Sequence, residues 1–112
     1  MSTNRGNLKL IQGTVDLLIL KALTGGPEHG YGVSAKIRQR SAGDLGIDDA
    51  ALYQALHRLE RRGLIASEWG LSDNNRRAKY YEITAAGRRC LAEETSRWRR
   101  YSRAVSAVLV ES

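Results

Sequence analysis

The sequence predicts a mainly α-helical domain that carries one small β-hairpin and ends in a long helix. Apolar residues recur at helical spacing in the first half of the chain and again from residue 85 onward. Between these parts, residues 65–83 alternate apolar with polar positions on either side of the turn-rich run SDNNRRA. Glycines and one proline divide the first half into short helical units.

The composition is typical of one soluble globular domain. The chain has 112 residues, of which 42% are hydrophobic and 27% charged. Its 18 Lys and Arg against 12 Asp and Glu give a formal net charge of +6, which favours nucleic acid, and then a membrane surface, as partners. Cys90 is the only cysteine, so an internal disulfide or a cysteine-rich zinc site is excluded. Residues 1–7 lack the apolar core of a signal peptide, and we expect a cytoplasmic protein.

Two short helices are predicted first. Thr14 is the expected N-cap of a helix over residues 15–23, whose apolar side chains surround its axis and must therefore be covered on all sides. The turn TGGPEHGYG leads to a second helix near Gly30, and we expect Tyr31 to pack at the junction of the two helices. Lys36 is expected to point outward from the second helix.

The third helix is predicted over residues 50–61, with Asp48 or Asp49 as its N-cap and an end before Gly63. Its apolar residues recur at helical spacing and are expected to face the core. These are Leu52, Ala55, Leu56 and Leu59. The opposite side carries aromatic, amide and basic side chains, namely Tyr53, Gln54, His57, Arg58 and Arg61.

The hairpin and the last helix complete the order of elements. Strands are expected near residues 65–71 and 79–83, with one ring of Tyr80 and Tyr81 facing inward, and Thr84 is the expected N-cap of a helix over residues 85–110. Three helices followed by a hairpin is the order of a winged helix-turn-helix domain, whose third helix enters the major groove of DNA. The alternative is a solvated helix face and a merely soluble hairpin tip. We favour a DNA-binding surface made of Lys36, Ala51, Tyr53, Gln54, His57, Arg58, Arg61, Asn75, Arg76, Arg77 and Lys79.

The last helix predicts a homodimer. One apolar stripe runs along it with the three-four alternation of a coiled-coil seam from Trp98 onward, although Glu94 interrupts its first turns. A two-fold partner would bury this stripe together with the first helix, which is apolar on all sides. The alternative, in which the last helix folds back onto its own domain, does not suit so long a helix. The expected interface comprises Leu17, Leu20, Leu91, Trp98, Tyr101, Val105, Val108 and Leu109.

Four stretches resemble the PadR-like family of transcriptional regulators: GTVDLLILKAL, PEHGYGVSAKI, ALYQALHRLERRGLIASEW and RAKYYEITAAG. The resemblance spans residues 13–98. It implies a dimeric winged-helix repressor on a palindromic operator, with the final helix exchanged between subunits, in the short subclass with a single C-terminal helix. The family usually has Ser or Thr with Pro near the start of the third helix, where this chain has Ala51 after Asp48 and Asp49. The operator sequence therefore does not follow from the resemblance.

Two interpretations of Trp98 stay open. Packing within the seam is the one we favour. Alternatively, Trp98 and its symmetry mate hold a planar aromatic effector between them, since the resembled family includes members that sense phenolic or planar compounds.

The sequence thus predicts three regions: a flexible arm over residues 1–12, a winged helix-turn-helix domain over 13–84, and a dimerisation helix over 85–112. We expect a homodimeric repressor that binds an inverted-repeat DNA operator and is released by a small planar or phenolic effector. Two distant histidines, one cysteine and no acid–histidine motif argue against an enzyme, a metal site or a cofactor. The alternative function is a winged-helix module that binds a protein or RNA.

Overall fold

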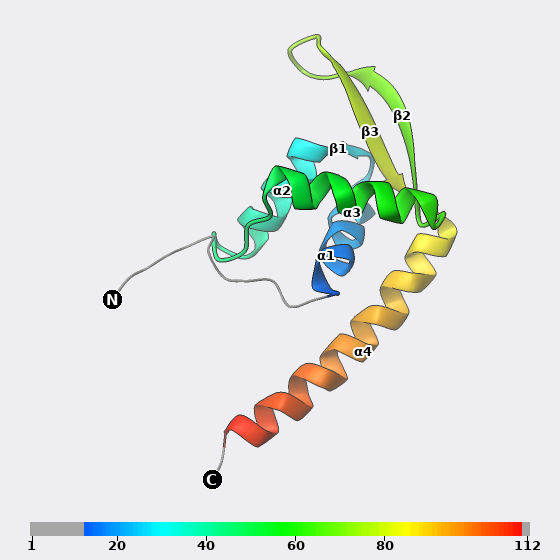
Figure 1. The fold of residues 1–112 in the computed structure, drawn as a ribbon. Helices are drawn as coiled ribbons and strands as arrows, with labels where there is room; N and C mark the ends of the chain where they lie inside the picture. Colours follow the sequence, from blue (N-terminus) through cyan, green and yellow to red (C-terminus); the bar gives the residue numbers. More distant parts are fainter. Residues whose placement is uncertain (1–12, 111–112) are drawn as a thin grey trace.

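The computed structural model describes residues 13–110 and confirms the mainly helical fold class with a hairpin (Figure 1). A short strand that the sequence did not predict is added to the hairpin. The elements in chain order are α1 (Thr14–Ala22), the 3-10 turn η1 (Leu23–Gly25), β1 (Glu28–His29), α2 (Gly30–Arg40), α3 (Asp49–Arg61), β2 (Ile65–Leu71), β3 (Arg77–Ile83) and α4 (Ala85–Leu109).

The core lies where α1, α2 and α3 meet the base of the hairpin. Ile19 of α1 and Leu56 of α3 are completely buried. The apolar positions predicted for the inner side of α3 are all buried, so the helical period assigned its core face correctly. The other large side chains that are almost fully buried are Leu20, Leu23, Val33, Leu52, Leu59 and Ile65.

The start of α1 differs from the prediction. Gly13, not Thr14, occupies the N-cap position, with a φ of 93°, and no side chain caps the helix. Glycine adopts this left-handed conformation without the strain that a Cβ would bring. The arm predicted over residues 1–12 lies outside the described residues.

The start of α3 follows the prediction. Asp48 is the N-cap, and its Oδ1 accepts a hydrogen bond of 2.8 Å from the backbone N–H of Ala51. Asp49 lies in the first turn, where a carboxylate interacts favourably with the helix dipole. Both carboxylates therefore have a structural role in beginning the helix.

The sheet is antiparallel, with the strand order β1-β3-β2. The pairing of β2 with β3 runs from Ile65 opposite Ile83 to Leu71 opposite Arg77, so the second strand begins two residues earlier than predicted. Across the tip, the N–H of Ser72 donates to the carbonyl of Arg76 over 2.8 Å. Tyr81 is buried and Tyr80 is only half-buried, so one ring of the pair faces inward, as expected.

The last strand and α4 meet in a tight joint. Thr84, the N-cap of α4, accepts a hydrogen bond from the Gly87 N–H over 3.0 Å and donates its hydroxyl to the Gly63 carbonyl over 2.8 Å. A Cβ on Gly87 would overlap the Leu64 carbonyl oxygen and press on Ile83, so only glycine fits here. This joint fixes the direction in which α4 leaves the body.

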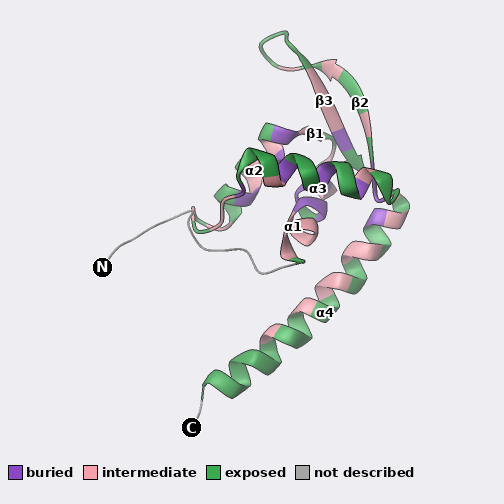
Figure 2. Ribbon diagram, in the orientation of Figure 1, coloured by how far each residue is buried: buried purple, intermediate pink, exposed green. Residues whose placement is uncertain are grey.

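The two ends of α4 have different surroundings. Ala86, Cys90 and Leu91 near its start pack against the core. The rest of the helix extends away from the body, and its surface is mostly exposed (Figures 1 and 2). α4 therefore does not fold back over its own domain.

Candidate nucleic-acid interface

One side of α3 is exposed and carries mostly polar side chains. Ala50, Gln54, His57 and Arg61 are all exposed, and their spacing of four, three and four residues places them on one helical face. We call these four residues the reading face. Gln can pair with the edge of adenine and Arg with that of guanine, so the residue types suit a helix lying in the major groove.

The flank of the reading face next to the hairpin is anchored by Tyr53 and Glu60. The Tyr53 hydroxyl occupies the space where a Cβ would stand on Gly30, so this glycine allows the ring to lie against the start of α2. Glu60 accepts a hydrogen bond of 2.6 Å from the Ser67 hydroxyl and lies 3.9 Å from the Lys79 ammonium. The Glu60 contacts thus join the hairpin to α3, and the Tyr53 contact joins α2 to it.

The tyrosine beneath this flank is insulated from water. Burial raises the pKa of the Tyr81 phenol, and the neighbouring Tyr53 and Glu60 raise it further. Tyr81 therefore stays neutral, as a packing residue between the sheet and α3.

The opposite flank of α3 is held by α1. Asp16 accepts hydrogen bonds from Nη2 of Arg58 and, over 3.4 Å, from its Nε, and it lies 3.7 Å from Nη1 of Arg62. The hydrogen bond to Asp16 raises the pKa of the Arg58 guanidinium above its ordinary value. No local sequence pattern predicts this partner, because Asp16 and Arg58 lie 42 residues apart.

The hairpin tip carries the expected basic side chains. Asn75, Arg76 and Arg77 are exposed, and Asn75 has a φ of 63°, a conformation that Asn tolerates better than most residues. The Arg77 guanidinium lies 4.5 Å from the ring centre of Trp69, a cation–π distance. Trp69, which is not among the contact residues predicted from the sequence, is itself 57% exposed.

A groove lies between the hairpin, the start of α2 and α3. Tyr31 lines it and is 77% exposed, so the expectation that it packs at the junction of the first two helices is wrong. The groove combines exposed rings with cations, a combination that suits a sugar-phosphate backbone. Its other lining residues include His29, Tyr53, Trp69, Arg76, Arg77 and Lys79.

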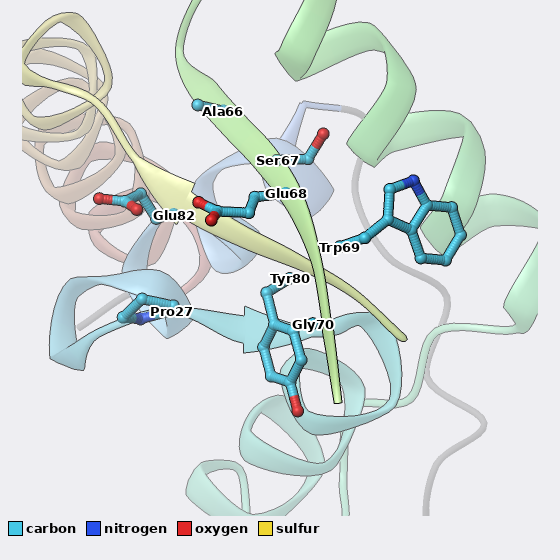
Figure 3. A pocket seen from close by; sticks show the side chains of 8 residues that line it. All are labelled: Pro27, Ala66, Ser67, Glu68, Trp69, Gly70, Tyr80 and Glu82. Atoms are coloured by element: carbon cyan, nitrogen blue, oxygen red, sulfur yellow. The ribbon is translucent and has the colours of Figure 1, made fainter. Parts of the chain in front are cut away.

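The two faces of the hairpin differ in charge. Trp69 pairs with Lys79 across the strands, so both project toward the groove. On the other face, Glu68 and Glu82 line one pocket together with the ring of Tyr80 (Figure 3). Only the face on the side of α3 therefore has the charge that would attract DNA.

Besides Arg58 and Lys79, three further predicted contact residues have internal partners or little free surface. Lys36 is half-buried, lies 3.1 Å from Glu28 and reaches the Ala22 carbonyl, so its charge is used within the domain. Ala51 is half-buried and packs against the core. Leu20 is only 1% exposed within the single chain, which leaves almost no surface for a partner subunit.

The remaining residues of the expected dimer surface are partly or fully accessible. Leu17 is half-buried, and Trp98 is half-buried with its ring 5.9 Å from that of Tyr101. Toward the end of α4, Val108 is 75% exposed and Leu109 76%. Together with Val105 they form an apolar surface on the projecting half of the helix, which Figure 2 colours as mostly exposed.

A three-helix body, an exposed polar face on the third helix and a basic hairpin together define a winged helix-turn-helix DNA-binding protein. More particularly, the chain belongs to the PadR-like family of transcriptional regulators, whose model matches residues 19–93. The resemblance inferred from the sequence is thereby confirmed, and the protein is a DNA-binding transcriptional regulator. Within residues 13–110, no helix has the length and apolarity needed to cross a membrane.

Solved structures of bacterial regulators share the fold. A transcriptional regulator from Clostridium thermocellum is 32% identical, with a TM-score of 0.78 over 86% of this chain and 93% of that one. A PadR family regulator from Eggerthella lenta is 31% identical, with a TM-score of 0.76 over 90% and 86% of the two chains. One from Clostridium difficile is 28% identical, with a TM-score of 0.76 over 88% and 100%.

Two curated proteins are similar in sequence. An uncharacterized protein from Lysinibacillus sphaericus is 34% identical over 90 residues, which cover 80% of this chain and 82% of that protein. An uncharacterized 37.1 kDa protein in a transposon of Streptomyces fradiae is 38% identical over 86 residues, 77% of this chain but 23% of the larger protein. The chain thus corresponds to about a quarter of the transposon protein.

Proposed function

We propose that the protein is a homodimeric repressor that binds an inverted-repeat operator. Each subunit places the reading face of α3 in the major groove and lays the hairpin against the neighbouring backbone, and occupancy of the operator blocks transcription. The observation that carries this proposal is the apolar surface on the projecting half of α4, which includes Val105, Val108 and Leu109.

We assign this surface to a second copy because no part of residues 13–110 covers it. Trp98, Tyr101, Val105 and Val108 follow each other at spacings of three, four and three residues, the alternation of a two-helix seam. An isologous pairing of two α4 helices would bury the seam and relate the two reading faces by a two-fold axis. Such an axis matches DNA half-sites about one helical turn, roughly 34 Å, apart.

The proposal is tested in two steps. Duplexes selected from a random pool by the purified protein should contain an inverted repeat, and sedimentation at micromolar concentration should report a dimer. A gel-shift comparison then uses the selected duplex, a duplex with one half-site scrambled and a single-stranded RNA of the same length. A monomer, or a preference for the RNA, would falsify the proposal in favour of an interaction or RNA-binding module.

The hairpin has its own test. Replacing Arg77 and Lys79 by alanine should weaken binding to all duplexes alike and lower the slope of log affinity against log salt by about one unit for each lost phosphate contact. Glu82→Gln, on the other face of the hairpin, is the control and should leave the slope unchanged. An unchanged slope in the double alanine variant would remove the hairpin from the interface.

We also propose that Trp98 contributes to an effector site at the two-fold seam. The ring is half-buried beside Tyr101, and a dimer would place two such pairs near the axis. Trp69 is the other tryptophan, so a Trp69→Phe variant isolates the emission of Trp98. Titration with planar aromatic compounds should quench this emission and weaken operator binding together. Absence of both effects across a panel would leave Trp98 as a packing residue.

A further inference from the structure

Asp16 binds two arginines of the DNA-reading helix from the side of α1. Nε and Nη2 of Arg58 each donate a hydrogen bond to the Asp16 carboxylate. Nη1 of Arg62 lies 3.7 Å from the same carboxylate. The Asp16 side chain is only 22% exposed. A two-pronged contact between guanidinium and carboxylate fixes the plane of the arginine as well as its position.

These arginines do not share the reading face. Gln54, His57 and Arg61 project on the side of α3 away from the body, whereas Arg58 and Arg62, four residues apart, lie along the flank next to α1. Arg61 thus differs from both neighbouring arginines, since no ion pair within residues 13–110 joins it to an acidic side chain.

We infer that Asp16 withholds Arg58 and Arg62 from the phosphates of DNA and so makes the domain more selective for its operator. The inference rests on the proposed DNA-binding function. An arginine that is free to meet a phosphate adds affinity for every sequence alike. Two arginines held by a carboxylate add little of this general attraction, and base contacts from the reading face then account for a larger share of binding.

Asp16→Asn tests the inference directly, since it removes the charge that holds both arginines. The salt slope should steepen by about 0.9 for each arginine released, up to about 1.8. Affinity for a non-specific duplex should rise, and the ratio of operator to non-specific affinity should fall. Glu93→Gln on α4 is the matched control, because it changes the net charge equally at an exposed site on another helix.

Arg58→Ala in two backgrounds separates withholding from simple charge. In the wild-type background the salt slope should stay unchanged, because Arg58 is already occupied. In the Asp16→Asn background the same change should reduce the slope by about 0.9. An equal reduction in both backgrounds, or a steepening in Glu93→Gln as large as in Asp16→Asn, would overturn the inference.

Thermal melting checks that each variant is folded. If Asp16→Asn fails to fold, Arg58→Ala in the wild-type background alone decides, since a slope reduced by about 0.9 contradicts the inference and an unchanged slope supports it. Failure of the wild-type protein to bind any duplex would instead refute the proposed function, so the two failures are distinguishable.

Discussion

The two halves of α4 belong to one continuous helix but depend on different partners. The first turns are tied to the body by the Thr84 cap and by the close approach of Gly87 to Leu64. The second half has an apolar surface around Val105 and Val108 that stays exposed within the described part of the chain. An exposed apolar surface of this kind on a soluble protein usually marks the place where another molecule binds. We therefore expect substitutions in the first half of α4 to change the stability of the folded chain, and substitutions in the second half to change dimer formation.

The change with the largest expected effect is Val105→Asp together with Val108→Asp. Two carboxylates in the proposed seam would lose their water without gaining partners, so the dimer should dissociate at micromolar concentration. Loss of two-site binding should lower operator affinity by at least about 100-fold. Sedimentation and gel shifts measure both effects.

Ala107→Asp is the control for this double change. Residue 107 is exposed on the other side of the same helical turns, so the added charge should leave the dimer intact. A dimer that survives the double aspartate variant would mean that α4 does not form the seam.

Gly87→Ala is expected to have the next largest effect, and on the other half of the helix. Glycine to alanine normally stabilises a helix, but here the new methyl group would overlap the Leu64 carbonyl. The free energy of unfolding should fall by about 1–3 kcal/mol, measured in urea at a fixed protein concentration. Ser96→Ala, farther along α4, should show no such loss. Equal stability of Gly87→Ala and wild type would contradict the tight joint.

Thr84→Ala should lower stability by less, about 1 kcal/mol, because it removes one N-cap. Thr84→Ser keeps the hydroxyl that accepts from Gly87 and should retain most of that stability. The comparison of the two variants by urea unfolding separates the cap from the loss of a methyl group. If serine is as damaging as alanine, the hydroxyl is not what stabilises the joint.

The smallest effect is expected for Arg97→Gln. Arg97 and Glu94 form an exposed ion pair at 3.0 Å, one turn apart on α4. Exposed pairs of this kind contribute less than about 1 kcal/mol and are screened by salt. Thermal melts at low and high salt should therefore nearly coincide with those of the wild type. A larger loss of thermal stability, seen only at protein concentrations where the dimer forms, would mean that the dimer seam includes Arg97.

The sequence predicted those features that depend on neighbouring residues. The core face of α3 follows from the spacing of its leucines, and the caps Asp48 and Thr84 follow from polar residues placed just before helical runs. The hairpin was recognised from its alternation and its polar tip. These signals are local, so one chain without relatives was enough to find them.

The missed features depend on contacts between distant parts of the chain. Strand β1 has only two residues and exists because it pairs with Tyr80 and Tyr81 of β3. The partners of Arg58 and Lys36 lie on other elements, and basic side chains that look alike in a sequence differ once such partners are known. The sequence predicts that Tyr31 packs at the junction of the first two helices, whereas its position in α2 leaves the ring exposed.

Because α4 is long, a small change in its direction at the joint with β3 displaces its far end by a large distance. The 25 residues of α4 rise 1.5 Å each, so the helix is about 37 Å long, and a tilt of about 10° at Gly87 swings its far end through roughly 6 Å. That displacement is a sizeable fraction of one turn of duplex DNA. The direction that this joint imposes on α4 therefore decides whether a pair of third helices is in step with the grooves.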